Sequence, residues 1–196
     1  TDGFARTLER HLQTLGIGPG VPVIVCGMAG SRQGWIEAPY VPVPTGLGEL
    51  AALAVRAPDT QRDVRILPGI CEAAPNHADV MRGEETQLAG LGLGKGKYLV
   101  AMPGTHSKWV LVDDGIVKQF STYMTGELFA QLSQHSILRH SVTGAGSFGP
   151  DHPQFVAAAR QMGEQPAGFS GALFSVRANS LVHGADATAS AARLSG

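Results

Sequence analysis

The sequence predicts an α/β fold, and three patterns support this prediction. Over residues 1–67, stretches with apolar residues at helical spacing alternate with short runs rich in Val and Ile. Between residues 98 and 122, three strand-like runs follow one another closely. From residue 125 onward the helical spacing returns. Strands that alternate with helices, or that are followed by them, are typical of a sheet covered by helices.

The N-terminal stretch predicts an amphipathic helix. Phe4, Leu8, Leu12 and Leu15 recur at helical spacing, and Gly16 follows as a stop signal. This stretch is polar overall and lacks the apolar segment of a secretory signal.

The next stretch predicts two strands separated by a loop and a helix. The continuous apolar run Val21–Cys26 is typical of a central strand buried on both faces. A loop rich in Gly and Pro is expected over 27–45, a helix over 47–55 and a short strand over 64–67.

The second half begins with a helix expected over 79–91, loosened by Gly83. Strands are expected over 98–102, 109–112 and 116–122. The last two are joined by Asp113-Asp114-Gly115, and Asp-Gly is a strong hairpin signal.

Helices are expected over the rest of the chain. One begins near Thr125, a plausible N-cap, and others cover 155–162, 168–182 and 186–194. Three antiparallel strands followed by helices are the beginning of an RNase H-like module.

Composition excludes several functions. Fifteen Lys and Arg against sixteen Asp and Glu give no basic footprint for nucleic acid or for an anionic membrane. The longest apolar runs are far too short to span a bilayer. Cys26 and Cys71 each stand beside apolar residues, as buried free thiols in a reducing compartment do. We therefore expect a soluble cytoplasmic protein.

The turn between the first two strands of the module carries the sequence PGTHSKW, residues 103–109. A Gly-containing turn directs backbone N–H groups to one side, and hydroxyls and a cation add further contacts, a set that suits phosphate. The candidate phosphate-binding residues are Gly104, Thr105, His106, Ser107 and Lys108. Strand alternation places Ser107 and Trp109 on one face and Lys108 on the other. The alternative is an ordinary solvated hairpin.

Other motifs lack their required context. Residues 144–149 match G-x-G-x-x-G but follow a helical run, and residues 90–97 resemble a Walker A loop without its Ser or Thr. The histidines do not have zinc-ligand spacing. A serine hydrolase that uses Ser170 and His183 remains an alternative from another class.

Two adjacent carboxylates, Glu84 and Glu85, lie on the helix expected before the phosphate turn. Their side chains point about 100° apart, so one can face a cleft while the other meets solvent. A solvated acidic helix face is the alternative reading.

Four stretches together resemble the 2-dehydro-3-deoxygalactonokinase family: CGMAGSRQGWIEAPY (26–40), DVMRGEETQLAG (79–90), PGTHSKW (103–109) and MTGELFAQLSQHSIL (124–138). The family resembles a branch of the sugar-kinase, Hsp70 and actin superfamily, in which two RNase H-like domains close on ATP and a substrate. The resemblance implies transfer of the γ-phosphoryl group of ATP, with Mg²⁺, to the 6-hydroxyl of 2-dehydro-3-deoxy-D-galactonate.

The resemblance also implies roles for residues. Related carbohydrate kinases have a Gly-Asp-Gln-Gln-type stretch in which the Asp accepts the hydroxyl proton. Glu84 aligns with that Asp and is the predicted general base, and Glu85 is the alternative. The loop with Ser31, Arg32, Gln33 and Trp35 follows the carboxyl end of a strand, where α/β sheets bind ligands, and Arg32 could clamp the carboxylate of a sugar acid.

By comparison with the superfamily, the chain is expected to be truncated at both ends. Residues 1–75 would form the latter part of the first RNase H-like domain, and 76–196 the front part of the second. The fragment alone is then expected to be inactive. A non-catalytic ligand-binding protein, a kinase for a related keto-deoxy sugar acid, galacto against gluco configuration, and a homo-oligomer are left open.

Overall fold

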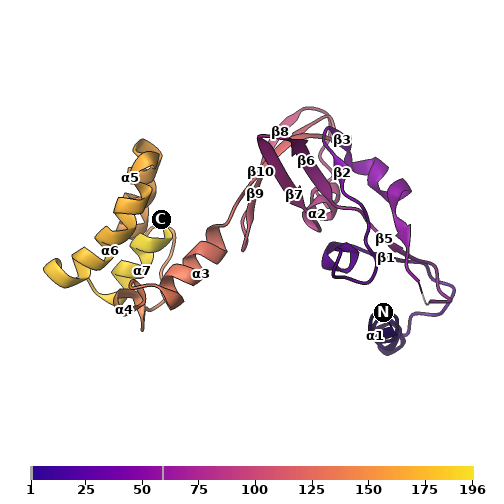
Figure 1. Cartoon of the computed structure of the whole chain (residues 1–196), viewed down its shortest axis with the longest axis horizontal. Helices are drawn as coiled ribbons and strands as arrows, with labels where there is room; N and C mark the ends of the chain where they lie inside the picture. Colours follow the sequence, from indigo (N-terminus) through magenta and orange to yellow (C-terminus); the bar gives the residue numbers. More distant parts are fainter. Residues whose placement is uncertain (1, 59) are drawn as a thin grey trace. The chain divides into compact units, whose positions relative to one another are not determined.

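The structure is a computed structural model that describes residues 2–58 and 60–196. The chain folds into two units, and each is described by itself. Unit 1 is the chain up to Pro103 together with Ser107–Tyr123, and unit 2 is Gly104–His106 together with Met124–Gly196. Figure 1 labels the elements of both units. Mixed helices and strands confirm the predicted α/β class.

Unit 1 begins with helix α1, Asp2–Thr14, which ends before Gly16 as predicted. Gly16 has φ +69°, a left-handed conformation that glycine adopts without strain. A small sheet follows, in the order β1 (Val23–Val25), β5 (Val64–Ile66) and β4 (Val55–Arg56). Strand β1 is parallel to β5, and β4 is antiparallel to it.

The prediction of a central strand over Val21–Cys26 is wrong. Strand β1 has three residues and lies at the edge of the sheet, with β5 as its neighbour. The side chain of Ile24 is 66% exposed, while Val23 and Val25 pack towards the core. The apolar run therefore covers only one face, because an edge strand can be apolar without being buried on both sides.

The core beneath this sheet contains Trp35, Ala38, Ala57, Val64 and Ile66. The ring of Trp35 stacks on Phe4 of α1, with centroids 6.0 Å apart. This contact closes the loop after β1, which begins with the 3₁₀ helix η1 (Gly27–Gly30), against the first helix. The helix expected over 47–55 is the 3₁₀ helix η2 (Leu47–Leu53).

A second sheet has the order β2 (Val41–Pro42), β6 (Ile70–Ala74) and β7 (His77–Met81). The hairpin β6–β7, which turns at Pro75-Asn76, was not predicted from the sequence. The prediction of a helix over 79–91 is therefore wrong in its first part. Gly83, with φ +114°, ends the extended segment, and helix α2 covers Glu84–Gly90.

The third sheet contains the three predicted antiparallel strands. Its order is β3 (Thr45–Gly46), β10 (Ile116–Tyr123), β9 (Ser107–Asp113) and β8 (Lys97–Met102). Asp114 and Gly115 both have positive φ, as the predicted two-residue hairpin requires. The inner face supplies Val110, Val112, Val117 and Phe120 to a core that also contains Leu50, Ile70, Met81 and Leu88.

The outer edge of β10 meets the β6–β7 hairpin through side chains. Register shifts between Val117 and Gln119, beyond the short pairing with β3. After this bulge, Glu72 accepts from Phe120 N at 2.8 Å, and Asp79 accepts from Thr122 N at 2.6 Å and from its hydroxyl at 2.7 Å. His77 Nε2 lies 3.1 Å from Phe120 O. These side chains satisfy backbone groups that a neighbouring strand would otherwise pair.

Unit 2 is helical after the turn Gly104–His106. Its helices are α3 (Thr125–His135), α4 (Arg139–Val142), α5 (Pro153–Glu164), η3 (Pro166–Gly168), α6 (Phe169–His183) and α7 (Ala187–Ser195). Figure 1 shows α5, α6 and α7 gathered together. Ser190, Ala191 and Ala192 of α7 are buried, and Asp186 caps this helix by accepting from Ala189 N at 2.8 Å. Except for the short α4, each of these α-helices was predicted.

Candidate active site

The segment Arg82–Glu85 is held in place by its own carboxylates. Helix α2 begins directly after Gly83, and its first two residues are Glu84 and Glu85. Glu84 Oε2 accepts from Arg82 N at 3.0 Å, and Glu85 Oε2 accepts from Gly83 N at 2.7 Å. Each carboxylate therefore satisfies a backbone amide at the helix start and lies near the positive end of the helix.

The two carboxylates differ in exposure. Glu85 is 1% exposed, and its Oε1 accepts from the hydroxyl of Thr86 at 3.2 Å. Burial raises the pKa of Glu85, against the lowering effect of the hydrogen bonds that it accepts, and the charge of Glu84 raises the pKa further. The side chain of Glu84 is 26% exposed, so a substrate can reach it.

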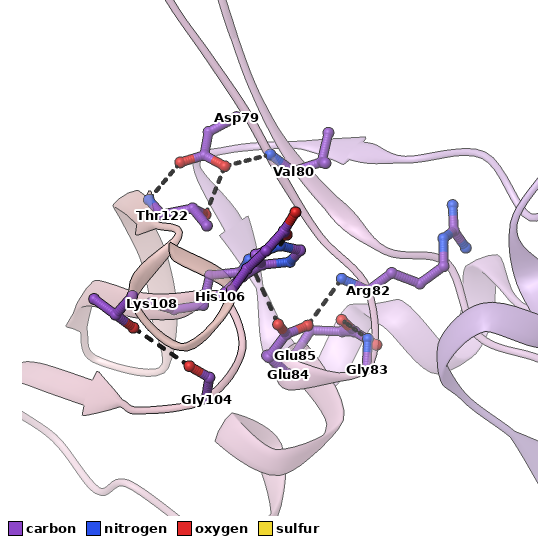
Figure 2. A network of polar contacts seen from close by, with 12 residues as sticks. Asp79, Val80, Arg82, Gly83, Glu84, Glu85, Gly104, His106, Lys108 and Thr122 are labelled. Carbon is purple, nitrogen blue, oxygen red and sulfur yellow. Dashed lines mark hydrogen bonds and ion pairs between the residues drawn. The ribbon is translucent and has the colours of Figure 1, made fainter. Parts of the chain in front are cut away.

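Glu84 also has a cationic partner. Lys108 Nζ lies 3.5 Å from Glu84 Oε1, and the lysine side chain is 5% exposed. Figure 2 shows both contacts of the Glu84 carboxylate, one from Arg82 and one from Lys108. Lys108 was predicted to be a phosphate-binding residue, and the structure brings it to the carboxylate predicted as the base.

The guanidinium of Arg82 points away from Glu84 (Figure 2). Its Nη2 donates to Ala38 O at 2.8 Å, and the guanidinium carbon lies 4.2 Å from the centroid of the Tyr40 ring. Among the described residues, Arg82 Nε and Nη1 and Trp35 Nε1 are buried without a hydrogen-bond partner. No local pattern predicts the Arg82–Tyr40 contact, because it joins residues 42 positions apart.

The predicted substrate loop lies against the same segment. A Cβ at Gly30 would lie 2.8 Å from Arg82 Nη1, and a Cβ at Gly83 would lie 3.4 Å from Gly27 Cα. Gly30 thus permits a close approach that a larger residue would crowd, whereas a Cβ at Gly83 would make an ordinary van der Waals contact. The loop after β1 therefore lies beside the residue that precedes Glu84.

Within this loop the four candidate substrate residues have different surroundings. Ser31 is 8% exposed and Trp35 is 4% exposed, so both lie in the fold of the loop. Arg32 and Gln33 are exposed. Arg32 Nε lies 3.5 Å from Glu37 Oε1, with side chains 80% and 52% exposed. Arg32 is thus the candidate cation that solvent, and a ligand, can reach.

In unit 2, the turn that carries Gly104, Thr105 and His106 is exposed and anchored to the start of α3. Glu127 N donates to Thr105 O at 3.0 Å, and the hydroxyl of Thr125 donates to Gly104 O at 3.3 Å. His106 Nε2 lies 2.5 Å from Glu127 Oε2. The first two contacts hold the backbone of the turn from its carbonyl side, and the third joins the side chain of His106 to α3.

Ser107 begins β9 in unit 1 and is half-buried. Trp109 is 47% exposed and lies on the outer face of β9, as strand alternation predicted.

The serine hydrolase alternative is wrong. Ser170 and His183 both lie on α6, at its two ends. Thirteen residues of α-helix separate them by about 20 Å, which is too far for a hydrogen bond between nucleophile and base. The described residues also contain no group of three or more His, Cys, Asp or Glu that could hold a metal ion. No helix in the described ranges has the length and apolar character needed to cross a membrane.

Comparisons with known proteins show which family the chain resembles. The sequence profile of the 2-keto-3-deoxy-galactonokinase family matches residues 1–196. The chain is 49% identical over 196 residues to a Rhizobium meliloti (strain 1021) protein named "Probable 2-dehydro-3-deoxygalactonokinase", covering 99% of the chain. It is 42% identical over 125 residues to the 2-dehydro-3-deoxygalactonokinase of Escherichia coli K12, covering 64% of the chain and 40% of that protein.

A solved structure gives the same result. The crystal structure of a candidate 2-dehydro-3-deoxygalactonokinase from Sinorhizobium meliloti matches 97% of the chain with a TM-score of 0.93 and 48% identity. The chain spans 64% of the length of the Rhizobium protein and 64% of the crystallised chain. The profile match over all 196 residues confirms the resemblance seen in the sequence: the chain belongs to the 2-keto-3-deoxy-galactonokinase family.

Proposed function

We propose that the intact protein transfers the γ-phosphoryl group of ATP to the 6-hydroxyl of 2-dehydro-3-deoxy-D-galactonate, giving the 6-phosphate and ADP. Membership of the family and the printed names of the relatives support this reaction. The structural observation that carries the proposal is Glu84, a partly exposed carboxylate held at both oxygens.

In this proposal Glu84 is the general base. As the 6-hydroxyl oxygen bonds to the γ-phosphorus, the bond from that phosphorus to the bridging oxygen breaks and the hydroxyl proton passes to Glu84. The proton then leaves to solvent, so the carboxylate is regenerated. A positioned base contributes about 10²–10⁴-fold to the rate. Glu85, the alternative base, is less suited because it is 1% exposed and its two oxygens accept hydrogen bonds within the segment.

The proposed contacts to the nucleotide phosphates come from the PGTHSKW stretch. Thr105 and His106 fit this role because they are exposed and because α3 holds the backbone of their turn. Gly104 and Ser107 stay in the proposed set. Mg²⁺, when bound with ATP, would neutralise charge on the phosphates. Phosphate suits hydroxyl and backbone N–H donors, which this stretch supplies.

The proposed sugar-acid contacts come from the loop after β1. Arg32 and Gln33 would meet the ligand, with the guanidinium of Arg32 exchanging Glu37 for the substrate carboxylate. Ser31 and Trp35 would shape the loop, since both are buried. A neutral sugar would leave the guanidinium without that partner, which gives a physical basis for selecting an acid.

We also propose that β8–β10 with α3 form the beginning of an RNase H-like module, within a domain that covers 76–196, and that 1–75 belong to another such domain. The strand order and the helix that follows support this assignment. A cytoplasmic location is part of the same proposal.

The test is a coupled assay of ADP release by the intact protein. We expect turnover with 2-dehydro-3-deoxy-D-galactonate, slower turnover with its gluco epimer, and none with galactose. The site of phosphorylation can be read from the phosphorus–carbon coupling in the product. Binding of both ligands without ADP release would instead establish a non-catalytic protein, and faster turnover of the gluco acid would reassign the substrate.

A further inference from the structure

Lys108 occupies an unusual place for a charged residue. It lies on the inner face of β9, the face that also carries Val110 and Val112, and it is 4% exposed. A buried ammonium group is costly unless a counterion compensates for its lost hydration. The position of Lys108 therefore requires an anionic partner inside unit 1.

That partner is Glu84. Lys108 Nζ lies 3.5 Å from Glu84 Oε1, while Glu84 Oε2 accepts from Arg82 N at 3.0 Å. The two oxygens of one carboxylate are thus held from two elements, β9 and the segment that precedes α2. Such double support fixes the direction of the carboxylate, which is the property that a general base needs.

The other charged groups of unit 1 near Glu84 are committed elsewhere or carry the same sign. Glu85 adds a neighbouring carboxyl group on α2. The guanidinium of Arg82 contacts Ala38 O and the Tyr40 ring, and Asp79 of β7 accepts from Thr122. Among the residues that the structure describes in this unit, Lys108 is the cation that makes an ion pair with Glu84.

We propose that Lys108 is a positioning residue that acts through Glu84 and is not a ligand of the nucleotide phosphates. This inference rests on the proposed function, because it assigns Glu84 the role of base. Lys108 keeps the carboxylate aimed before the reaction, since its contact with Oε1 fixes the direction of the side chain.

The same pair assists recovery after the transfer. When Glu84 has accepted the hydroxyl proton it is neutral, and the ammonium of Lys108 is left buried without a counterion. This state is costly. Release of the proton from Glu84 to solvent restores the ion pair, so the base is regenerated for the next turnover without any further group.

The first experiment compares Lys108→Met and Lys108→Arg in the intact protein. Lys108→Met removes the charge and keeps the apolar stem, so we expect kcat to fall about 10- to 100-fold. If Lys108 does not bind phosphate, its removal leaves the binding of ATP unchanged. The KM for ATP should then change less than about threefold. Because an attractive charge is lost, we expect the acidic limb of the kcat profile to move to higher pH.

Lys108→Arg keeps the charge and should return that limb towards its wild-type position. The matched control is Lys118→Met, at an exposed lysine in the bulge of β10, which should leave both kcat and the pH profile unchanged. A rise of about tenfold or more in the KM for ATP with kcat retained would overturn the proposal, since loss of a group that only binds the nucleotide acts in this manner.

A second measurement separates this inference from the proposed function. The titration of the Glu84 carboxyl carbon is followed by ¹³C NMR in wild type, Lys108→Arg and Lys108→Met. A higher midpoint in Lys108→Met supports the pairing even if the wild-type protein shows no turnover, in which case only the proposed reaction fails. Equal midpoints in Lys108→Met and an active wild-type enzyme overturn the role of Lys108. If Lys108→Met does not fold, wild type and Lys108→Arg are compared. Closely similar midpoints and kcat values in these two proteins support the role of the charge. A shifted midpoint together with a much lower kcat in Lys108→Arg overturns it.

Discussion

The segment Arg82–Glu85 and the turn Pro103–His106 offer polar groups in opposite ways. In the first, both glutamates have defined partners and one of them is buried. In the second, all four residues are exposed, and the contacts with α3 hold two carbonyl groups and the side chain of His106. A carboxylate that takes a proton gains from a fixed direction. A turn that receives a large charged ligand can keep its side chains in water until the ligand arrives.

The largest expected effect comes from a substitution in the segment Arg82–Glu85. Glu84→Gln keeps the size of the side chain and its acceptor for Arg82 N but removes the basic oxygen. We expect kcat to fall about 10²–10⁴-fold with little change in the KM for either substrate, because the base acts only in the transition state. Steady-state kinetics on the intact protein measures this. Glu164→Gln, at an exposed position of α5, is the control. Near-normal turnover of Glu84→Gln would remove this residue from the mechanism.

The next effect breaks the support of the turn. A Cβ at Gly126 would lie 2.8 Å from Gly104 O and 2.9 Å from Thr105 Cα, so Gly126→Ala forces the turn away from α3. We expect a loss of about 1–3 kcal/mol in the free energy of unfolding, as for other overpacked sites. The KM for ATP should rise more than the KM for the sugar acid.

Gly171→Ala is the matched control for this change. It lies in α6, and its Cβ would meet nothing within 4 Å. Alanine should stabilise that helix by about 0.5–1 kcal/mol. Denaturant unfolding of both variants checks the pair of expectations. Equal stability of the two variants would show that α3 does not constrain the turn.

A smaller effect sharpens the contrast between the two glutamates. Burial raises the pKa of Glu85 above its ordinary 4.5, so its stabilising contribution is complete below that pH and is lost as pH rises through the folded pKa. In Glu85→Gln this loss disappears, and Gly83 N and the hydroxyl of Thr86 keep partners. The difference in unfolding free energy between variant and wild type should therefore shift in favour of the variant as pH rises above about 4.5.

Urea unfolding at several pH values measures this difference. The control Glu85→Ala leaves Gly83 N without its acceptor and opens a cavity, so it should be less stable than wild type at every pH. A pH-independent difference between Glu85→Gln and wild type would contradict the expected burial effect.

The smallest effect on stability comes from Arg32→Gln. Its ion pair with Glu37 is exposed on both sides, and such pairs contribute about 0–1 kcal/mol. The unfolding free energy should thus remain nearly unchanged, while the KM for the sugar acid rises and the KM for ATP does not. Glu37→Gln removes the same ion pair but keeps the guanidinium, so it separates the two roles. Equal changes in both KM values for Arg32→Gln would contradict the proposal that Arg32 binds the carboxylate of the sugar acid.

Local patterns predicted the elements whose signal is contained in a few residues. The Asp-Gly hairpin and the stop at Gly16 each depend on one backbone conformation. The hairpin β6–β7 was missed because Glu72, Ala73 and Ala74 have weak strand preference, and pairing across Pro75-Asn76 decides their conformation. The edge position of β1 depends on its neighbours and not on its own sequence.

The candidate site shows the same limit. Alternation along β9 already placed Lys108 on the face opposite to Ser107 and Trp109. This is the face that carries Val110 and Val112. A lysine on an apolar face is a signal for a buried ion pair, but its partner lies on another element. The pairing with Glu84 spans 24 residues of sequence and is set by the packing of α2 against the sheet, so no local pattern contains it.

Glu72, His77 and Asp79 of the hairpin β6–β7 contact the edge of β10, and this affects how the protein behaves in concentrated solution. A bare strand edge invites another chain to add to the sheet, and this is a common route to aggregation. On β10 the amides of Phe120 and Thr122 are already occupied by Glu72 and Asp79. The side chains of the hairpin β6–β7 therefore prevent a strand of another chain from pairing with these two amides.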